Sequence, residues 1–349
     1  MVAPPWFDVP PDGYGGTEQL VATLVDGLID RGHDVVLIAA GEDRTRAELV
    51  RTFSETPVGL GEPVSLPIEL IHAATAAERL DVLGVDIVHD HSVVGPVFAP
   101  YRPVPTVVTV HGPLEGWMRR LYGAMREVLF VAISDSQRST APELDWLATV
   151  HNGIDVQATP FRRRKGDDFV FLGRIDPTKG VLDAIEIARR TGHPLRIAAK
   201  ASDDAERAYL DEAVRPRLGD GVEYLGDVDA DRKLELLAGA RALLFPIDWN
   251  EPFGLVMIEA MSCGTPVIAR RRGSVPEVVD EGRTGFVGDS IDDLVEACGR
   301  LDELDPAEIR RVCTERFDGA RMTERYEAAY EAAIRRRRSD PREQLVAGA

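Results

Sequence analysis

The chain of 349 residues is long enough for two domains, each with its own hydrophobic core, and 44% hydrophobic residues are typical of a globular protein. Its formal net charge of −18 argues against nucleic acid as a main partner, because a phosphate backbone would be repelled. The three cysteines form no CxxC pair, no apolar run is long enough for a membrane span, and the first residues do not resemble a signal peptide. We therefore expect reduced thiols and a cytoplasmic protein.

The first half of the chain alternates short apolar runs with longer segments of helical periodicity. Its first strand is only a stub, because Met1–Ala3 runs directly into two prolines; either this strand is very short or the true start of the chain lies upstream of Met1. The other strands predicted here are Val35–Ala39, Asp86–His89, Thr106–Val110, Leu129–Ile133 and Ala148–Val150, and the predicted helices include Thr17–Arg31 and Ile68–Leu83.

The second half repeats this rhythm. Its predicted strands are Phe169–Leu172, Leu195–Ala198, Val222–Leu225, Ala242–Phe245 and Pro266–Ala269. Its predicted helices include Val181–Thr191, Ser202–Val214 and Ala230–Ala240, and a long helix rich in Ala, Glu and Arg covers Asp318 to about Arg338.

Strands that alternate with helices indicate an α/β protein with parallel sheets covered on both faces. Two such series predict two doubly wound, Rossmann-like domains. The turn at Asn152–Asp155 and the basic run that follows it mark the boundary. We predict a first domain at 1–155, a second at 156–318, a final helix at 319–338 and a frayed tail at 339–349.

The segment that begins at Trp249 carries the most information about function. It follows the predicted strand Ala242–Phe245, and an apolar helix begins near Leu255. Glu251 lies in the loop and Glu259 about 6 Å along the helix axis, so both carboxylates point toward the region where the amides of the helix N-terminus converge. Carboxylates that accept hydroxyl protons beside an anion site fit a nucleotide or a nucleotide sugar. The alternative is that Glu259 pairs with a buried arginine and that Glu251 is an ordinary surface residue.

A second motif, Gly173–Gly180, follows the predicted strand Phe169–Leu172. Arg174 and Lys179 bracket its tight loop, and a guanidinium together with an ammonium at the start of a helix suits a diphosphate. The loop lacks the Walker A order, and its charges are alternatively only solvated. Lys200, which follows the next strand, is a weaker candidate for a phosphate or sugar contact. After Pro266–Ala269, the residues Gly273 and Ser274 are candidates to supply backbone amides.

Two candidates lie in the first half of the chain. The adjacent glycines Gly15 and Gly16 open a predicted helix, where backbone can approach an anion closely; a plain flexible turn is the alternative. His111 directly follows the strand Thr106–Val110, so its imidazole can hydrogen-bond a sugar hydroxyl or act as a base, unless it is a structural histidine.

No metal site is predicted. His89 and His91 flank Asp90, but no further ligands at metal spacing accompany them. Asp227-Val228-Asp229 has the letters of a DxD motif but lies in a predicted turn. Arg174 and Lys179 can neutralise a departing diphosphate, so a metal is not required.

Taken together, these residues resemble the GT-B glycosyltransferases of glycosyltransferase family 4, from Pro4 to about Tyr330. The most specific element is Glu251, seven residues and Glu259, continued by Ser262–Ala269. The family's diphosphate loop matches Gly173-Arg174 with Lys179-Gly180. Three further signatures match Tyr14–Glu18, Thr109–Gly112 and Asn152–Asp155.

The resemblance implies two Rossmann-like domains that face a cleft, with a C-terminal helix that crosses back to the N-terminal domain. The donor would bind in the C-terminal domain and the acceptor mainly in the N-terminal one, with retention and without a metal. The resemblance assigns catalysis to His111, Glu251, Arg174 and Lys179. The donor-binding residues that it and the motifs indicate are Gly15, Gly16, Arg174, Lys179, Lys200, Glu251, Phe253, Gly254, Leu255 and Glu259.

The main hypothesis is therefore a retaining glycosyltransferase that moves a hexose from a nucleoside-diphosphate sugar to an unidentified acceptor, which is a glycan, a lipid-linked molecule or a small molecule. No cofactor is expected, and the family favours UDP- or GDP-sugars as co-substrate. The alternative enzyme is a nucleotide-sugar epimerase on the same architecture. A non-catalytic sugar-nucleotide-binding protein is a third hypothesis. The oligomeric state is not readable from the sequence.

A membrane contact is also considered. Trp117, Arg119, Arg120 and Arg126 follow the His111 loop and form a basic, aromatic helix. If this helix is exposed, it can make a weak peripheral contact with the inner face of an anionic membrane. The alternative is an ordinary helix that packs Trp117, Leu121 and Met125 inward.

Overall fold

A computed structural model describes residues 1–13 and 15–339 of the chain. It divides into two compact units, one formed by Met1–Gly153 together with the chain from Gly319, the other by Ile154–Asp318. We call these the N-terminal unit and the central unit. The sequence analysis placed the first junction two residues later and the second at the same peptide bond. The tail it predicted from 339 lies outside the described residues from 340 onward.

The N-terminal unit is built on parallel strands. Strands β3 (Val88–Asp90), β4 (Thr106–Val110), β5 (Val128–Ala132) and β6 (Trp146–Thr149) form a sheet in that order, and β1 (Val36–Ala40) pairs with β2 (Glu48–Phe53). The stub strand is reduced to Val2, which bridges Ile38 and Asp90 in parallel and so connects the two groups. The strand β2 was not predicted, because Glu48 and Arg51 interrupt its apolar pattern.

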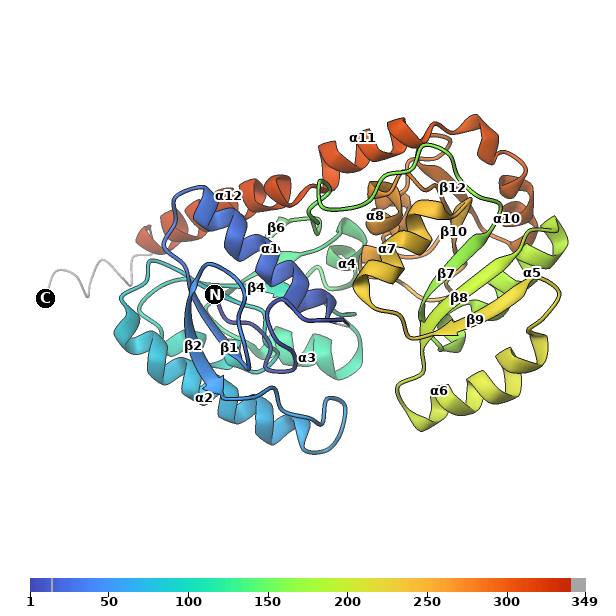
Figure 1. Cartoon of the computed structure of the whole chain (residues 1–349). Helices are drawn as coiled ribbons and strands as arrows, with labels where there is room; N and C mark the ends of the chain where they lie inside the picture. The colour runs from blue at the N-terminus through green and yellow to red at the C-terminus, as the bar shows by residue number, and fades with distance from the viewer. Residues whose placement is uncertain (14, 340–349) are drawn as a thin grey trace, which may run out of the picture. The chain divides into compact units, whose positions relative to one another are not determined.

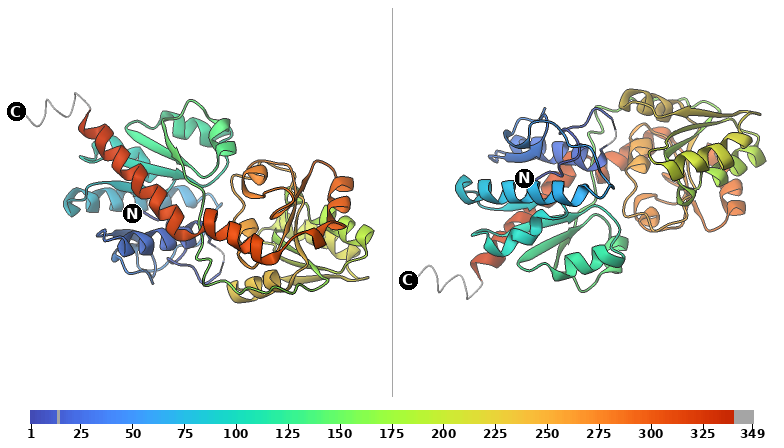
Figure 2. Two further views of the ribbon diagram at one scale, coloured as in Figure 1. Left: turned by 90° about the horizontal axis from the view of Figure 1, so that it is seen from above. Right: turned by 90° about the horizontal axis from the view of Figure 1, so that it is seen from below.

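Five α-helices belong to the described part of this unit: α1 (Gly16–Asp30), α2 (Ser65–Leu83), α3 (Gly116–Ala124), α4 (Asp135–Thr140) and α12 (Gly319–Arg338). A 3-10 helix, Gly95–Tyr101, precedes β4. The helix α12 is separated from the rest of its unit by more than 160 residues of sequence, and Figure 2 shows it running diagonally over the other elements of this unit.

The helix α12 is held by a core that it shares with α1, β4 and β5. Met322, Tyr326 and Tyr330 recur at helical spacing and are buried against Leu24 and Val131 among others. The Tyr326 hydroxyl also lies 2.8 Å from Thr109 Oγ1. The final helix is thus part of the core of the N-terminal unit.

The central unit contains a six-stranded parallel sheet with helices packed around it (Figure 1). Its strands are β7 (Phe169–Arg174), β8 (Leu195–Lys200), β9 (Val222–Gly226), β10 (Ala242–Phe245), β11 (Val267–Arg270) and β12 (Gly285–Gly288). Their order is β12-β11-β10-β7-β8-β9, which is the doubly wound order of a Rossmann sheet. The sequence analysis missed β12, which is only four residues long and bounded by glycines.

The α-helices of the central unit form two groups by mutual contact. Helices α5 (Val181–Thr191) and α10 (Ile291–Cys298) contact each other, and α8 (Leu255–Ser262) contacts both α7 (Ala230–Gly239) and α11 (Pro306–Phe317). Two short helices, α6 (Asp204–Tyr209) and α9 (Val275–Val278), complete the described set. The predicted helix Ser202–Val214 is divided, since a π-helical turn replaces α-helix from Leu210.

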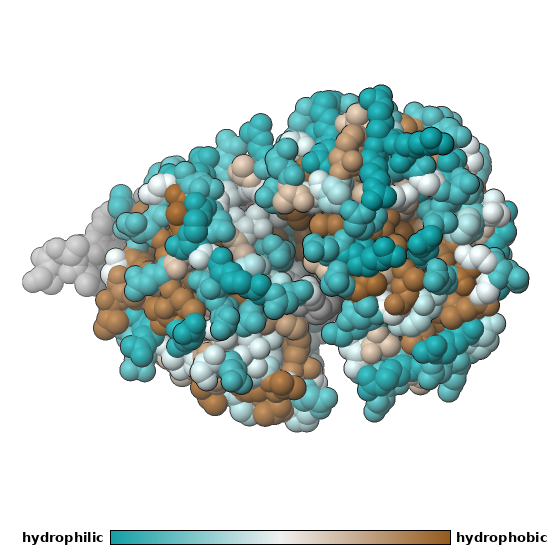
Figure 3. All heavy atoms as spheres, in the orientation of Figure 1, coloured by the Kyte–Doolittle hydropathy of each residue, from teal (hydrophilic) through white to brown (hydrophobic). Residues whose placement is uncertain are grey.

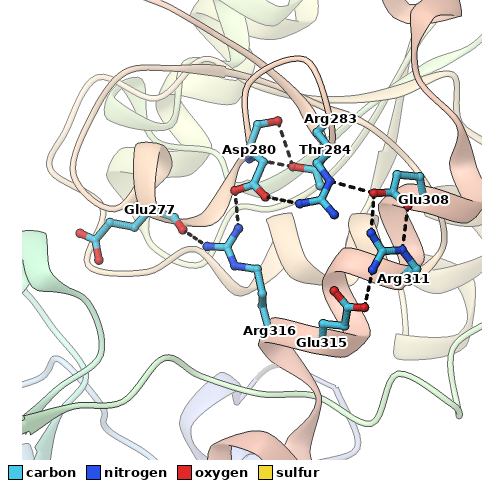
Figure 4. Close-up of polar contacts among 8 residues, drawn as sticks. All are labelled: Glu277, Asp280, Arg283, Thr284, Glu308, Arg311, Glu315 and Arg316. Atoms are coloured by element: carbon cyan, nitrogen blue, oxygen red, sulfur yellow. Dashed lines mark hydrogen bonds and ion pairs between the residues drawn. The ribbon is translucent and has the colours of Figure 1, made fainter.

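A network of charged side chains joins the segment between α9 and β12 to α11 (Figure 4). Arg316 donates to the Glu277 carbonyl and to Asp280, and Arg283 donates to Glu308 at 2.8 Å. Glu308 also accepts from Arg311 at 2.7 Å. These hydrogen bonds lower the pKa of Glu308 to about 2. The network thus fastens α11, the last helix of the central unit, to the segment that leads into β12.

Among the described residues, no helix is both long and apolar enough to span a membrane. Brown spheres in Figure 3 gather over the N-terminal end of α2 and the loop before it. The exposed apolar side chains in this region are Val58, Leu60, Val64, Leu66, Leu70 and Ile71.

We predict that Tyr326→Ala lowers the free energy of unfolding by about 3–5 kcal/mol, because it removes a large, fully buried ring from the core shared by α12. Urea denaturation measures this change. The control is Tyr101→Ala, which truncates a tyrosine that is 82% exposed and should change stability little. Equal stability of the two variants would show that α12 is not part of the core.

Candidate active site

The order of the central sheet identifies where a ligand is expected. The strands β7 and β10 are parallel neighbours, and the order of successive strands reverses between them: β8 and β9 extend the sheet on one side, and β11 and β12 extend it on the other. In open α/β sheets, ligands bind beyond the carboxyl ends of the strands at such a point. Arg174 ends β7, and the loop with Glu251 follows β10. The two motifs that the sequence analysis singled out therefore meet at the expected edge.

Arg174 is fixed by acidic side chains. Its Nε donates to Glu206 Oε1 at 2.6 Å, and a second guanidinium nitrogen lies 3.7 Å from Asp203 Oδ2. Glu206 is buried on α6, and its other oxygen accepts the Ser202 amide at 2.6 Å. Lys200 lies beside Arg174 in the register of β7 and β8. Two cationic residues thus end neighbouring strands, and a buried acid orients one of them.

Lys179 joins the loops after β7 and β10. Its Nζ lies 2.9 Å from Glu251 Oε2 and 4.2 Å from the centre of the Trp249 ring. The backbones also meet, since the Asp248 amide donates to Thr178 O at 2.7 Å. A Cβ on Gly180 would lie 2.2 Å from Pro246 O, so only glycine permits this approach. The basic loop and the acidic loop are therefore one structural feature.

The loop after β11 holds the backbone of Glu251 and Phe253 in place. The Ser274 amide donates to Glu251 O at 3.0 Å, and the Ser274 hydroxyl donates to Phe253 O at 2.9 Å. A Cβ on Gly273 would lie 2.3 Å from Glu251 O. The sequence analysis proposed amides from Gly273 and Ser274 for a ligand; the Ser274 amide instead holds the backbone of Glu251.

Glu259 projects from α8, which begins at Leu255 as predicted. Its Oε1 lies 2.5 Å from Lys233 Nζ on α7, and the two side chains are 18% and 32% exposed. The alternative of a buried arginine partner is therefore wrong, because the partner is a lysine and the pair remains accessible. The sequence analysis did not select Lys233, although it is one of only four lysines in the chain.

Of the residues between the two glutamates, Phe253 belongs to the core, and Gly254 and Leu255 form the start of α8. The side chain of Phe253 is buried and packs edge-on against Phe317, with ring centres 6.0 Å apart. This side chain therefore belongs to the core of the central unit. Gly254 caps α8 in the left-handed conformation, and Leu255 is its first residue. The anion site proposed at this helix N-terminus stays a prediction.

In the N-terminal unit, Gly15 and Gly16 lie at the start of α1. Gly15 is the N-cap with φ 145°, and Gly16 is the first helical residue. Glu18 in the first turn is buried, and this burial raises the pKa of its carboxyl to about 7. Tyr14 of the same motif lies outside the described residues.

His111 lies at the end of β4 and is half-buried. Its Nε2 is 2.8 Å from Nδ1 of His91, and the two rings are stacked with centres 5.1 Å apart. Burial lowers the pKa of His111 to about 4, so its imidazole is neutral at pH 7. The sequence analysis did not connect these two histidines.

The other candidates for a metal are engaged in protein contacts. Asp90 forms a buried ion pair with Arg102 at 3.1 Å, and Asp229 caps α7 by accepting the Arg232 amide. His89 contacts the hydroxyls of Tyr330 and Thr109. Within residues 1–13 and 15–339, no group of three or more His, Cys, Asp or Glu side chains is placed to hold a metal ion.

The helix α3 differs from its predicted packing. Trp117 is 80% exposed, with the Arg120 guanidinium 5.0 Å from the centre of its ring. The side chains that pack inward are Met118, Tyr122 and Met125. The alternative in which Trp117, Leu121 and Met125 pack inward is wrong for Trp117, because the buried stripe begins one residue later.

Comparison with known proteins identifies the family. The model described as Glycosyltransferase Family 4 matches residues 14–158, and the model described as Glycosyl transferases group 1 matches residues 157–316. The chain belongs to glycosyltransferase family 4. The enzyme is 29% identical to a glycogen synthase of Mycobacterium tuberculosis over 334 residues, which cover 80% of each chain.

Solved structures agree with the fold. A glycosyltransferase involved in avilamycin A biosynthesis, AviGT4, has a TM-score of 0.72 and 26% identity, over 95% of this chain and 96% of its own. Anabaena Alr3699/HepE, solved with UDP and glucose, has a TM-score of 0.71 at 18% identity, over 91% and 96% of the two chains. The predicted GT-B class is confirmed, and the protein is a glycosyltransferase.

We predict that Gly273→Ala distorts the loop that carries Glu251, because the new Cβ would lie within 2.5 Å of Glu251 backbone atoms. The expected loss is at least about 1–3 kcal/mol of unfolding free energy, measured by thermal or urea denaturation. The control is Gly282→Ala, which has a similar positive φ but no atom within 4 Å of the new Cβ. A loss of equal size in both variants would assign the effect to φ strain rather than to the contact.

Proposed function

We propose that this glycosyltransferase transfers a hexose from a nucleoside-diphosphate sugar, with retention and without a metal ion. The observation that supports the proposal is that Arg174 ends β7 and Lys179 pairs with Glu251 at the switch point of the central sheet, while Glu259 lies on the helix α8 that follows this loop. Positive groups at the carboxyl ends of strands suit a diphosphate, and their charge stabilises a departing nucleoside diphosphate.

In this proposal, Arg174 and Lys179 bind the diphosphate, with Lys200 beside Arg174 as an auxiliary cation. Glu259 accepts hydrogen bonds from the ribose hydroxyls, and Glu251 accepts one from the transferred sugar. Each of these glutamates contacts a lysine, Glu259 at 2.5 Å and Glu251 at 2.9 Å. Carboxylate oxygens accept hydrogen bonds, which is the chemistry that sugar hydroxyls require.

The remaining donor contacts come from backbone. The amides around Phe253, Gly254 and Leu255 are proposed to hold the transferred sugar, and the backbone at Gly15 and Gly16 to close over the donor. His111 is proposed to contact the sugar near the reacting carbon. Because burial holds the pKa of His111 near 4, it would act as a neutral hydrogen-bonding group rather than as a cation.

The donor proposed first is a UDP-sugar, because the structurally similar HepE was solved with UDP and glucose. A GDP-sugar is the second choice. The acceptor is a glycan, a lipid-linked molecule or a small molecule. Neither a resident cofactor nor nucleic acid has a part in this proposal.

We predict that one nucleotide among UDP, GDP, ADP and dTDP raises the melting temperature of the wild type and not of Arg174→Ala. A ligand at about 100 times its dissociation constant adds roughly 2.7 kcal/mol of stability. Transfer from the matching sugar nucleotide should fall at least about 100-fold in the variant, because a charge-assisted contact to the developing negative charge is lost.

The matched control is Arg190→Ala, which removes the same charge from an exposed pair with Asp292 on the surface. It should bind and turn over like the wild type. A fully active Arg174→Ala enzyme would refute the assignment of the diphosphate site. Chromatography of the sugar nucleotide without acceptor tests the alternative, since an epimerase would isomerise the donor.

We further propose a weak peripheral membrane contact through α3. The exposed Trp117 and the exposed guanidinium of Arg120 present an aromatic and a cationic group together. Because the whole chain carries a net charge of −18, attraction to an anionic surface must be local and sensitive to salt. The protein would then be cytoplasmic, with access to the inner face of the membrane.

We predict that the wild type cosediments with vesicles containing phosphatidylglycerol at low salt and that Trp117→Ser reduces this binding several-fold. Binding should disappear at about 0.5 M salt, where charges are screened beyond a few ångströms. Tyr101→Ser is the control, since this aromatic ring is equally exposed but lies outside α3. Equal binding by both variants, or none by the wild type, would rule out this contact.

A further inference from the structure

Two histidines leave neighbouring strands at one edge of the N-terminal sheet. His91 directly follows β3 and His111 directly follows β4, and these strands are paired in parallel. The backbone amide of His91 donates to Val2 O at 2.9 Å, which holds its chain in place. The side chain of His91 is buried, whereas His111 remains partly accessible. The buried imidazole of His91 thus lies next to the partly accessible imidazole of His111.

The contacts of the two rings determine the direction of the hydrogen bond between them. Burial lowers the pKa of both histidines, so both are neutral and each carries one ring proton. Nε2 of His91 lies 3.1 Å from the sulfur of Met1, and a thioether can only accept. The proton of His91 is therefore on Nε2, and its Nδ1 accepts from His111 Nε2 at 2.8 Å.

It follows that His111 carries its proton on Nε2 and has an unprotonated Nδ1. We propose that His91 is a positioning residue, which holds His111 in the Nε2–H tautomer so that Nδ1 accepts a hydrogen bond from a hydroxyl of the transferred sugar. This inference rests on the proposed function. The inference adds a rule of donor selection to the proposed function. The transferred sugar must carry a hydroxyl that donates a hydrogen bond to Nδ1 of His111, and an oxygen that can only accept a hydrogen bond would not be selected.

The ring below His91 is built differently. His89 lies 4.0 Å from His91 between ring centres, and its two nitrogens contact the hydroxyls of Tyr330 and Thr109. It therefore anchors the stack to α12 and β4. A phenyl ring in place of His91 would keep the stacking on His89 but could not accept from His111. The substitution therefore distinguishes a role of His91 in packing from a role in positioning His111.

The test compares three substitutions of one residue type. His91→Phe should lower kcat for sugar transfer about 10-fold while the thermal shift with UDP stays as in the wild type, because UDP lacks the sugar. His91→Asn, whose Oδ1 can take the place of Nδ1 as acceptor, should restore most of the activity. His193→Phe, the same change at a partly exposed histidine in the central unit, is the control and should leave kcat unchanged.

A double-mutant cycle removes the ambiguity of a structural effect. In a His111→Phe background, His91→Phe should cause no further loss of kcat, since the group that it positions is already absent. Additive losses would overturn the inference, because His91 would then act independently of His111. Wild-type activity of His91→Phe would overturn it as well and would leave the proposed transferase function intact.

A spectroscopic measurement tests the inference without activity. Nitrogen-15 NMR of the uniformly labelled full chain should show His111 with protonated Nε2 and unprotonated Nδ1, and His91→Phe should produce a mixture of tautomers. A protonated Nδ1 in wild-type His111 refutes the inference. If the wild type transfers no sugar from any nucleotide sugar, the proposed function fails, but the tautomer of His111 is still decided.

Discussion

The contact between Lys179 and Glu251 joins two loops that are 72 residues apart in the chain, and the candidate active site is arranged around it. It exists because β7 and β10 are neighbours in the sheet, although the α-helices α5, α6 and α7 and the strands β8 and β9 lie between them in sequence. Two glycines make the approach possible. Gly180 lies against Pro246 O and Gly273 against the backbone of Glu251, where any side chain would push the loops apart. The geometry of this candidate site therefore depends first on close backbone packing and then on charge.

The charged side chains at this edge of the sheet are held in ion pairs with one another. In a chain with a net charge of −18, every lysine lies in the central unit, and Lys179 and Lys233 each face a glutamate of the same motif. Partly exposed ion pairs contribute only about 0–1 kcal/mol, so a diphosphate can compete for them. Lys165 has another role, because it donates to the carbonyls of Ala238 and Cys263 and thereby ties α7 to the end of α8. Its burial lowers its pKa to about 8. Lysine thus has two roles in this unit, since Lys165 stabilises the fold and Lys179 and Lys233 belong to the candidate site.

The N-terminal unit depends on a segment from the far end of the chain. The helix α12 contributes Tyr326 and Tyr330 to its core, and their hydroxyls reach the polar groups of Thr109 and His89 beneath the stacked histidines. Burial keeps His89, His91 and His111 neutral. The hydrogen bond between His91 and His111 is directional, since each neutral ring has one donor and one acceptor. The packed helix α12 and the stacked histidines are therefore parts of one arrangement.

The local pattern of apolar residues determined the alternation of strands and helices, the two doubly wound domains and most element boundaries to within one or two residues, because the burial of one face of an element requires a short-range repeat of apolar residues. The GT-B class came from the resemblance of the motifs to a known family. Thr106–Val110, Val181–Thr191 and Ala242–Phe245 were predicted with their observed bounds. The strands β2 and β12 were not predicted, since Glu48 and Arg51 interrupt the apolar pattern of β2 and only four residues form β12.

The motif residues Arg174, Lys179, Glu251 and Glu259 could be selected because each belongs to a motif at the end of a predicted strand. Their partners could not. Lys233 for Glu259, Glu206 for Arg174 and His91 for His111 are decided by strand order and by the packing of helices on the sheet, which no local pattern records. The exposure of Trp117 was decided in the same way, because a helix of nine residues can bury either of two adjacent stripes until the tertiary fold selects one.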